Sequence, residues 1–76
     1  MIFGKRLKEL LEENKISQQV FAEKIGYSQR GVSRWINLQS EPTEGAIRKT
    51  AIFFDVSTDY LLGLEDETGV KIDIEI

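Results

Sequence analysis

The chain has 76 residues, a length typical of one small domain. It has no cysteine and no histidine, which excludes disulfide bonds, thiol chemistry and the commonest general base. The formal net charge is −3, but residues 1–40 carry seven Lys or Arg against four Glu, whereas residues 41–76 carry three against nine Asp or Glu. A first half of net charge +3 therefore leaves a nucleic-acid partner open.

Several classes of protein lack support in this sequence. No apolar run is long enough for a membrane span or a signal peptide, so we expect a cytoplasmic protein without a membrane partner. No metal-binding motif and no glycine-rich phosphate cradle are present. We therefore predict that the chain is not an enzyme and uses no cofactor or metal.

The first predicted helix spans Lys5 to Asn14. Its apolar positions step by three and four residues while charged residues take the other side. Ser17 can cap a second helix that runs to about Lys24, where its side chain would accept a hydrogen bond from a free backbone N–H group.

Residues 18–37 predict two short helices that meet at a glycine turn. One apolar stripe consists of Phe21, Ala22 and Ile25, and a second of Val32, Trp35 and Ile36. Between them, Gly26 can adopt the left-handed conformation that ends a helix. Ser28 can then cap the next helix, which we place at about residues 28–36.

Two further helices and a strand complete the prediction. Thr43 can cap a fourth helix that ends at Asp55, with a buried face of Ile47, Thr50, Ala51 and Phe54. Ser57 can cap a fifth helix, Thr58 to Leu62. We divide the chain into a domain of residues 1–64 and an acidic tail of residues 65–76.

Within the tail, residues 70–76 alternate between aliphatic and charged side chains, which predicts a short β-strand. A single strand needs a partner. Met1 to Phe3 of the same chain, the same strand of a second chain, or a downstream domain could supply it. We favour the first two together, as a small sheet that contributes to a dimer.

The central segment resembles a known family. The residues that carry the resemblance are Ser17, Gln18, Ala22, Gly26, Ser28, Val32, Ser33 and Trp35. They are similar to the helix-turn-helix of Cro and lambda repressor, the XRE family of transcriptional regulators, and flanking matches extend from Arg6 to Gly63. The resemblance implies an all-α, five-helix lambda-repressor-like DNA-binding domain, to which this chain adds the C-terminal β-strand.

The resemblance also implies how DNA is bound. The helix at about residues 28–36 would enter the major groove and read base edges with its outward side chains, Gln29, Arg30, Ser33 and Arg34. Arginine suits guanine and glutamine suits adenine. Contacts to DNA phosphates are expected from Ser17, Gln18 and Asn37.

Two departures from the family pattern stand out. The loop that follows Asn37 contains no Lys or Arg and carries Glu41, so we expect few phosphate contacts there and a shallow salt dependence. The arginine and glutamate that many members pair are replaced by Leu11 and Ile36, which we expect to pack together. On that basis Ile36→Glu would bury an unpaired charge and cost roughly 3 kcal/mol or more.

These features together predict a repressor that binds an inverted-repeat operator as a homodimer. Candidate dimer contacts are Phe53, Tyr60, Leu64, Ile72 and Ile74. Two alternatives remain open. The chain could be an antitoxin whose tail binds a toxin, or a protein-interaction module that no longer binds DNA. A regulatory protein partner is compatible with each of these functions.

Overall fold

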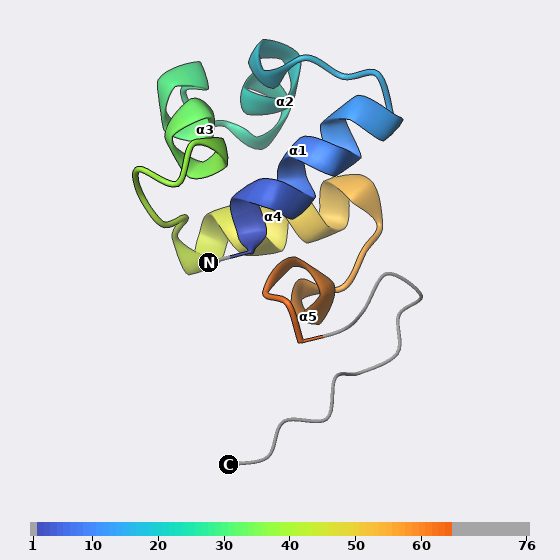
Figure 1. Cartoon of the computed structure of the whole chain (residues 1–76). Helices are drawn as coiled ribbons and strands as arrows, with labels where there is room; N and C mark the ends of the chain where they lie inside the picture. Colours follow the sequence, from blue (N-terminus) through green and yellow to red (C-terminus); the bar gives the residue numbers. More distant parts are fainter. Residues whose placement is uncertain (1, 65–76) are drawn as a thin grey trace.

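The computed structural model describes residues 2–64 and shows five helices in that part of the chain (Figure 1). They are α1 (Phe3–Glu13), α2 (Gln18–Ile25), α3 (Gln29–Ile36), α4 (Glu44–Phe54) and α5 (Thr58–Leu61). No β-strand occurs among the described residues, which confirms the all-α, five-helix prediction. The strand predicted at residues 70–76 lies outside them.

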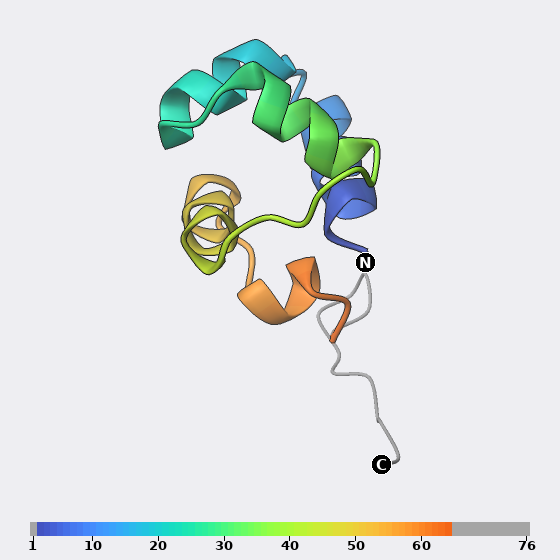
Figure 2. The same cartoon turned by 90° about the vertical axis from the view of Figure 1, so that its left-hand side faces the viewer.

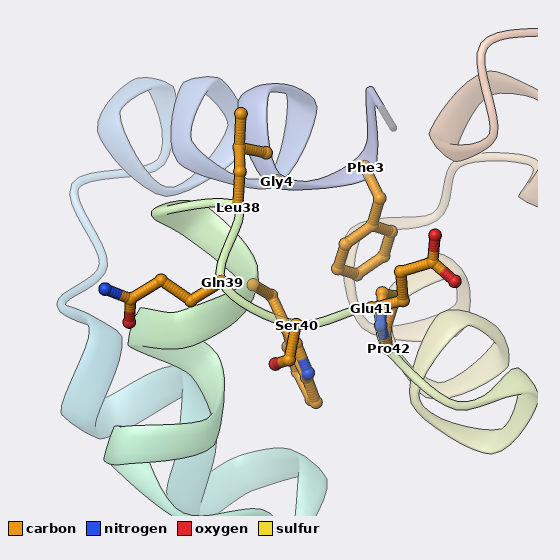
Figure 3. A pocket seen from close by; sticks show the side chains of 8 residues that line it. Phe3, Gly4, Leu38, Gln39, Ser40, Glu41 and Pro42 are labelled. Atoms are coloured by element: carbon orange, nitrogen blue, oxygen red, sulfur yellow. The ribbon is translucent and has the colours of Figure 1, made fainter.

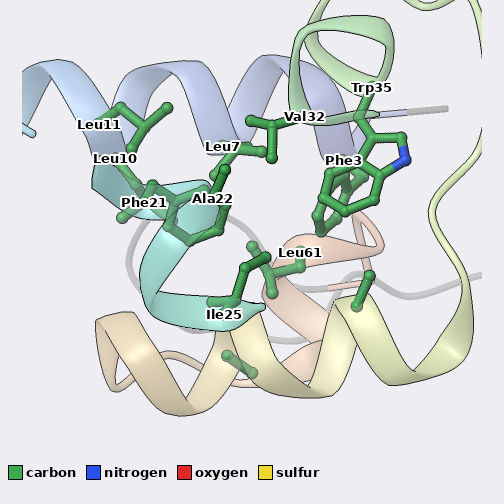
Figure 4. Close-up of a cluster of buried hydrophobic side chains, with 12 residues drawn as sticks. Phe3, Leu7, Leu10, Leu11, Phe21, Ala22, Ile25, Val32, Trp35 and Leu61 are labelled. Atoms are coloured by element: carbon green, nitrogen blue, oxygen red, sulfur yellow. The ribbon is translucent and has the colours of Figure 1, made fainter. Parts of the chain in front are cut away.

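The helices pack around one core. α1 contacts α3 and α5, α2 contacts α3 and α4, and α4 contacts α5. Figure 2 shows α2 and α3 together on one side of the molecule and α4 and α5 on the other. Twelve buried apolar side chains fill the space between them (Figure 4): Phe3, Leu7, Leu10, Leu11, Phe21, Ala22, Ile25, Val32, Trp35, Ala46, Ala51 and Leu61.

Four helices begin at a hydroxyl residue whose side chain accepts a hydrogen bond from the backbone N–H group three residues later. These residues are Ser17, Ser28, Thr43 and Ser57, as the sequence predicted. Each bond satisfies one of the N–H groups that the first turn of a helix leaves free. The starts of α2 to α5 are therefore encoded locally.

All five helices end in the same hydrogen-bonded motif, the Schellman motif. A residue with positive φ follows the last turn, and its N–H group bonds to the carbonyl oxygen three residues back, at 3.1 to 3.4 Å. The next N–H group bonds five residues back, at 2.7 to 3.0 Å. The positive-φ residues are Lys15, Gly26, Leu38, Asp55 and Gly63. The endings predicted at Gly26 and Asp55 are confirmed.

The N-terminus corrects one prediction. α1 begins at Phe3, two residues earlier than expected, and Phe3 is completely buried in the core. Ile2 precedes the helix with φ of −81° and ψ of −11°, and its carbonyl oxygen accepts a hydrogen bond from the Arg6 N–H group. Phe3 is therefore part of a helix and not of a strand, so the prediction that it pairs with a C-terminal strand is wrong. Met1 lies outside the described residues.

Gly4 allows α1 to approach α3 closely. A Cβ atom at this position would lie 2.1 Å from the Trp35 carbonyl oxygen and 3.2 Å from the Ile36 Cα atom. Backbone atoms cannot move aside as a side chain can. The contact between Gly4 and the last turn of α3 therefore fixes how α3 sits on the core.

Candidate nucleic-acid interface

The inner face of α3 anchors it to the core. Val32 is completely buried and Trp35 is nearly so. The Trp35 ring meets the Phe3 ring edge-on, with centroids 6.0 Å apart, and the Tyr27 ring at 5.3 Å. Because Ser28 also caps the first turn, both the start and the inner side of α3 are held, and its opposite face must point outward.

The outward face of α3 brings the four predicted base-reading side chains together. Gln29, Arg30 and Arg34 are exposed, Ser33 is half-buried, and all four line one hollow at the surface. A fifth side chain lines the same hollow: Gln39, from the loop after α3. No sequence pattern pointed to Gln39, because only the backbone turn at the end of α3 places it there.

Ser17 and Gln18, two of the predicted phosphate contacts, line a separate hollow at the start of α2. Ser17 is exposed, and its hydroxyl oxygen accepts a hydrogen bond from the Val20 N–H group at 3.1 Å. Lys8 and Lys15, both exposed, line this hollow too. The two lysines add positive charge beside the start of α2, which sequence reasoning did not anticipate.

Leu11 and Ile36, the aliphatic replacements for the family's charged pair, line the same hollow at the start of α2. Leu11 is buried and Ile36 is half-buried. They come from α1 and α3, which pack together. Their shared position supports the predicted contact, but Ile36 is more exposed than that prediction assumed.

Asn37, the third predicted phosphate contact, lies at the end of α3. It is exposed, and its side-chain amide donates a hydrogen bond to the Ser33 hydroxyl oxygen at 3.3 Å. One base-reading candidate and one phosphate-contact candidate therefore support each other. The contact holds the Asn37 amide close to the outward face of α3.

The loop that joins α3 to α4 separates its polar side chains. Glu41 lines a hollow with Phe3, Gly4 and Trp35. Gln39 lines this hollow as well as the one around Arg30, whereas Glu41 does not line the hollow around Arg30. Figure 3 shows Glu41 and Gln39 leaving the loop in opposite directions. The acidic side chain thus points away from Gln39, and it does not line the hollow of the base-reading candidates.

Tyr27 ties the turn between α2 and α3 to the start of α4. Its hydroxyl group shares a hydrogen bond of 3.1 Å with the Thr43 hydroxyl group. The Lys49 ammonium lies 5.4 Å from the centre of the Tyr27 ring and donates to the Ile25 carbonyl oxygen at 3.3 Å. These contacts make Tyr27 a packing residue.

The candidate dimer residues have different surroundings. Phe53 is half-buried and packs edge-on against Phe21 and Phe54, while the Tyr60 ring lies 4.2 Å from the guanidinium of Arg6. Leu64 is 38% exposed. Ile72 and Ile74 lie outside the described residues.

Arg6 and Ile52 differ from what their residue types suggest. Arg6 is only 8% exposed, although arginine is rarely buried, whereas Ile52 is 80% exposed on α4. The sequence indicated that Ile52 would be exposed, because it lies off the apolar stripe of its helix.

Within residues 2–64, no group of His, Cys, Asp or Glu side chains could hold a metal ion, and no helix could span a bilayer.

Comparison with known proteins identifies helix-turn-helix proteins as relatives of this chain. A family model described as helix-turn-helix matches residues 7–61. The HTH-type transcriptional regulator ImmR of Bacillus subtilis (strain 168) is 33% identical over 76 residues, which cover all of this chain and 59% of ImmR. The chain thus spans less than two thirds of the length of this curated relative.

Two solved structures share the fold. The solution structure of the DNA-binding domain of the P22 c2 repressor has a TM-score of 0.75 and 26% identity, and covers 82% of each chain. The N-terminal DNA-binding domain of SinR from Bacillus subtilis has a TM-score of 0.75 and 30% identity. That match covers 87% of this chain and 94% of the SinR domain.

Proposed function

Because the chain belongs to the helix-turn-helix family, we propose that it binds double-stranded DNA sequence-specifically and represses transcription by occupying an operator. One observation carries this proposal: Gln29, Arg30, Ser33 and Arg34 line a single hollow on the outward face of α3. The P22 c2 and SinR structures, which are similar to this one, are both of DNA-binding domains.

The proposed mechanism places α3 in the major groove. The arginine guanidinium groups can each donate two hydrogen bonds to guanine O6 and N7, and the Gln29 amide can pair with adenine N6 and N7. Val32 and Trp35 hold the helix from behind, so these side chains are presented on a rigid element. Rigid presentation is what allows one base pair to be distinguished from another.

Contacts to the sugar-phosphate backbone would set the position of α3 in the groove. We assign them to Ser17, Gln18 and Asn37, with additional positive charge from Lys8 and Lys15. The first turn of α2 contributes its backbone N–H groups, which favour an anion at a helix N-terminus.

We further propose that the operator is an inverted repeat bound by a homodimer. Two copies related by a two-fold axis would place their α3 helices in half-sites roughly 34 Å apart, one turn of DNA. Leu64, with Leu62 beside it, is an exposed apolar candidate for the contact between copies. Phe53, Tyr60, Ile72 and Ile74 remain the other candidates. Sedimentation equilibrium of the parent protein and Leu64→Asp would test this interface.

Selection of binding sites from a random pool of double-stranded DNA tests the proposed function. The parent protein should enrich one motif, and Arg30→Ala and Arg34→Ala should each lose the preference for guanine at one position of the half-site. The expected loss is roughly tenfold or more in discrimination at that position.

Lys24→Ala provides a charge-matched control for these variants. Lys24 is exposed at the end of α2 and lines a different hollow, with Ile52 and Phe53. Its removal should leave the enriched motif unchanged. Arginine variants that select the parent's motif with unaltered preferences would show that α3 does not read the bases.

A protein-binding surface is a second candidate function, and the exposure of Ile52 supports it. Ile52 and Phe53 line an apolar hollow with Lys24 and Lys49. An interaction module would use such a surface. An antitoxin would bind its toxin through the acidic tail, so removal of residues 65–76 should abolish toxin binding but leave DNA binding intact. If the parent prefers no DNA sequence even at low salt, an interaction module becomes the better description.

A further inference from the structure

Gln39 lies outside α3 but on the same surface as the four candidate base-reading residues of that helix. We propose that Gln39 reads a base pair of the operator and is a further specificity-determining residue. This inference rests on the proposed function, because it adds a contact to the same DNA-binding site. Its starting point is the hollow that Gln39 lines together with Gln29, Arg30, Ser33 and Arg34.

The backbone anchors Gln39 to the end of α3. Its N–H group donates to the Arg34 carbonyl oxygen at 2.8 Å, and the Leu38 N–H group donates to the Trp35 carbonyl oxygen at 3.2 Å. Leu38 has φ of 59°, which turns the chain back over the last helical turn. Gln39 is therefore held by the helix, as the base-reading side chains are.

The other four helix ends show why Gln39 is unusual. In this motif the residue after the left-handed one commonly makes a hydrophobic contact with the helix it follows. The corresponding residues here are Ile16, Tyr27, Val56 and Leu64, and the first three pack against the core. Among the helices of residues 2–64, only α3 has an amide side chain at this position, and that residue is exposed. Packing therefore does not explain the choice of glutamine.

The direction of the side chain agrees with a role in recognition. Figure 3 shows Gln39 extending from the loop away from Glu41 and Phe3. Its amide offers one donor and one acceptor group, the pair that adenine N6 and N7 require. Because Gln39 follows the last turn of α3, it should read a base pair near those contacted by Arg34 and away from those contacted by Gln29.

Site selection with Gln39 variants tests the inference. Gln39→Ala should keep the positions that depend on Arg30 and Arg34 but lose roughly tenfold in preference at one further base pair of the half-site. Gln39→Arg should shift that same base pair from adenine toward guanine. Ser40→Ala is the matched control, because Ser40 is exposed on the same loop but does not line the hollow.

The outcomes separate this inference from the proposed function. If the parent enriches a motif and Gln39→Ala enriches the same motif with equal preferences, Gln39 is not a base reader and the proposed function stands. Uniformly weaker binding to all sequences would indicate a backbone contact and would also overturn the inference. A parent protein that enriches no motif would remove both proposals.

Discussion

Leu38 shows how a single residue can hold a conformation that its type disfavours. It is 67% exposed and has φ of 59°, a region that costs a residue with a Cβ atom about 1 kcal/mol or more. Its left-handed conformation completes the hydrogen bonds that end α3, so the strain at Leu38 is held in place by the helix.

Replacing Leu38 by glycine should stabilise the protein by roughly 0.5 kcal/mol. The relief of strain exceeds the loss from a more flexible unfolded chain, and little apolar area is given up. Urea denaturation would measure the change in the free energy of unfolding. Ser40→Gly is the control, since Ser40 has no positive φ and the substitution should destabilise. Equal responses of the two variants would contradict the strain argument.

The burial of Arg6 could not be predicted from its residue type. A charged residue near the start of an amphipathic helix normally lies in solvent, but Arg6 is buried beside the Tyr60 ring. Its Nη1 atom is buried without a hydrogen-bond partner in the described part of the chain. The packing of α5 on α1 creates this environment, so no pattern within α1 could reveal it.

At the scale of whole elements, the sequence predicted the helices whose boundaries are encoded locally. Ser17, Ser28, Thr43 and Ser57 each cap a helix where the pattern placed one. The start of α1 was placed two residues late because Ile2 offers no side-chain cap. The left-handed residues Lys15 and Leu38 were missed because glycine and asparagine are the usual signals for that conformation.

The part of the candidate site that lies on one helix was predictable from the sequence, and the part that depends on contacts between elements was not. The 3.6-residue period of α3 identifies which side chains share its outward face, and the structure shows that they line one hollow. Gln39, Lys8 and Lys15 depend on how separate elements meet, which periodicity does not describe.

The close approach of α1 and α3 leads to a prediction about Gly4. Gly4→Ala should destabilise the protein by roughly 2 to 3 kcal/mol, because the new methyl group would collide with the Trp35 carbonyl group. Thermal or urea unfolding would measure the loss. Gly45→Ala is the matched control. Its Cβ atom would approach nothing closer than the Tyr27 hydroxyl oxygen at 3.6 Å, so it should stabilise by about 0.5 kcal/mol.

The contact between α1 and α3 also modifies the expectation for Ile36→Glu. Ile36 is half-buried and shares a hollow with Lys8 and Lys15, so a glutamate could reach water and two positive charges. We expect a loss of roughly 1 to 2 kcal/mol, less than full burial would cost. Addition of Leu11→Arg should restore part of it. A double-mutant cycle in urea would measure the coupling, and a coupling energy near zero would show that the two positions are independent.

At the scale of the whole molecule, the distribution of charge should control how binding depends on salt. Each additional phosphate neutralised by a basic residue steepens the slope of log affinity against log salt concentration by about 0.9. Glu41→Lys should therefore strengthen binding to all DNA sequences and steepen the slope by roughly one. Titrations at several salt concentrations would measure both effects.

Glu23→Lys makes the same change of charge elsewhere and serves as the control. Glu23 is exposed on α2 and lines the hollow with Ile52, away from the loop after α3. Its effect on the slope should be clearly smaller. If the two variants steepen the slope equally, the loop has no particular proximity to the phosphates and only the net charge matters.

The contact of α5 with α1 has a consequence for synthesis on the ribosome. Leu61 belongs to the same buried cluster as Phe3 and Leu7, yet it leaves the exit tunnel last of the three. At about 5 to 20 residues per second, the seven residues that follow Phe54, up to and including Leu61, take on the order of a second to synthesise. Until Leu61 joins the core, the buried cluster lacks one of its side chains, and a chaperone that recognises apolar surface could engage the residues that Leu61 covers.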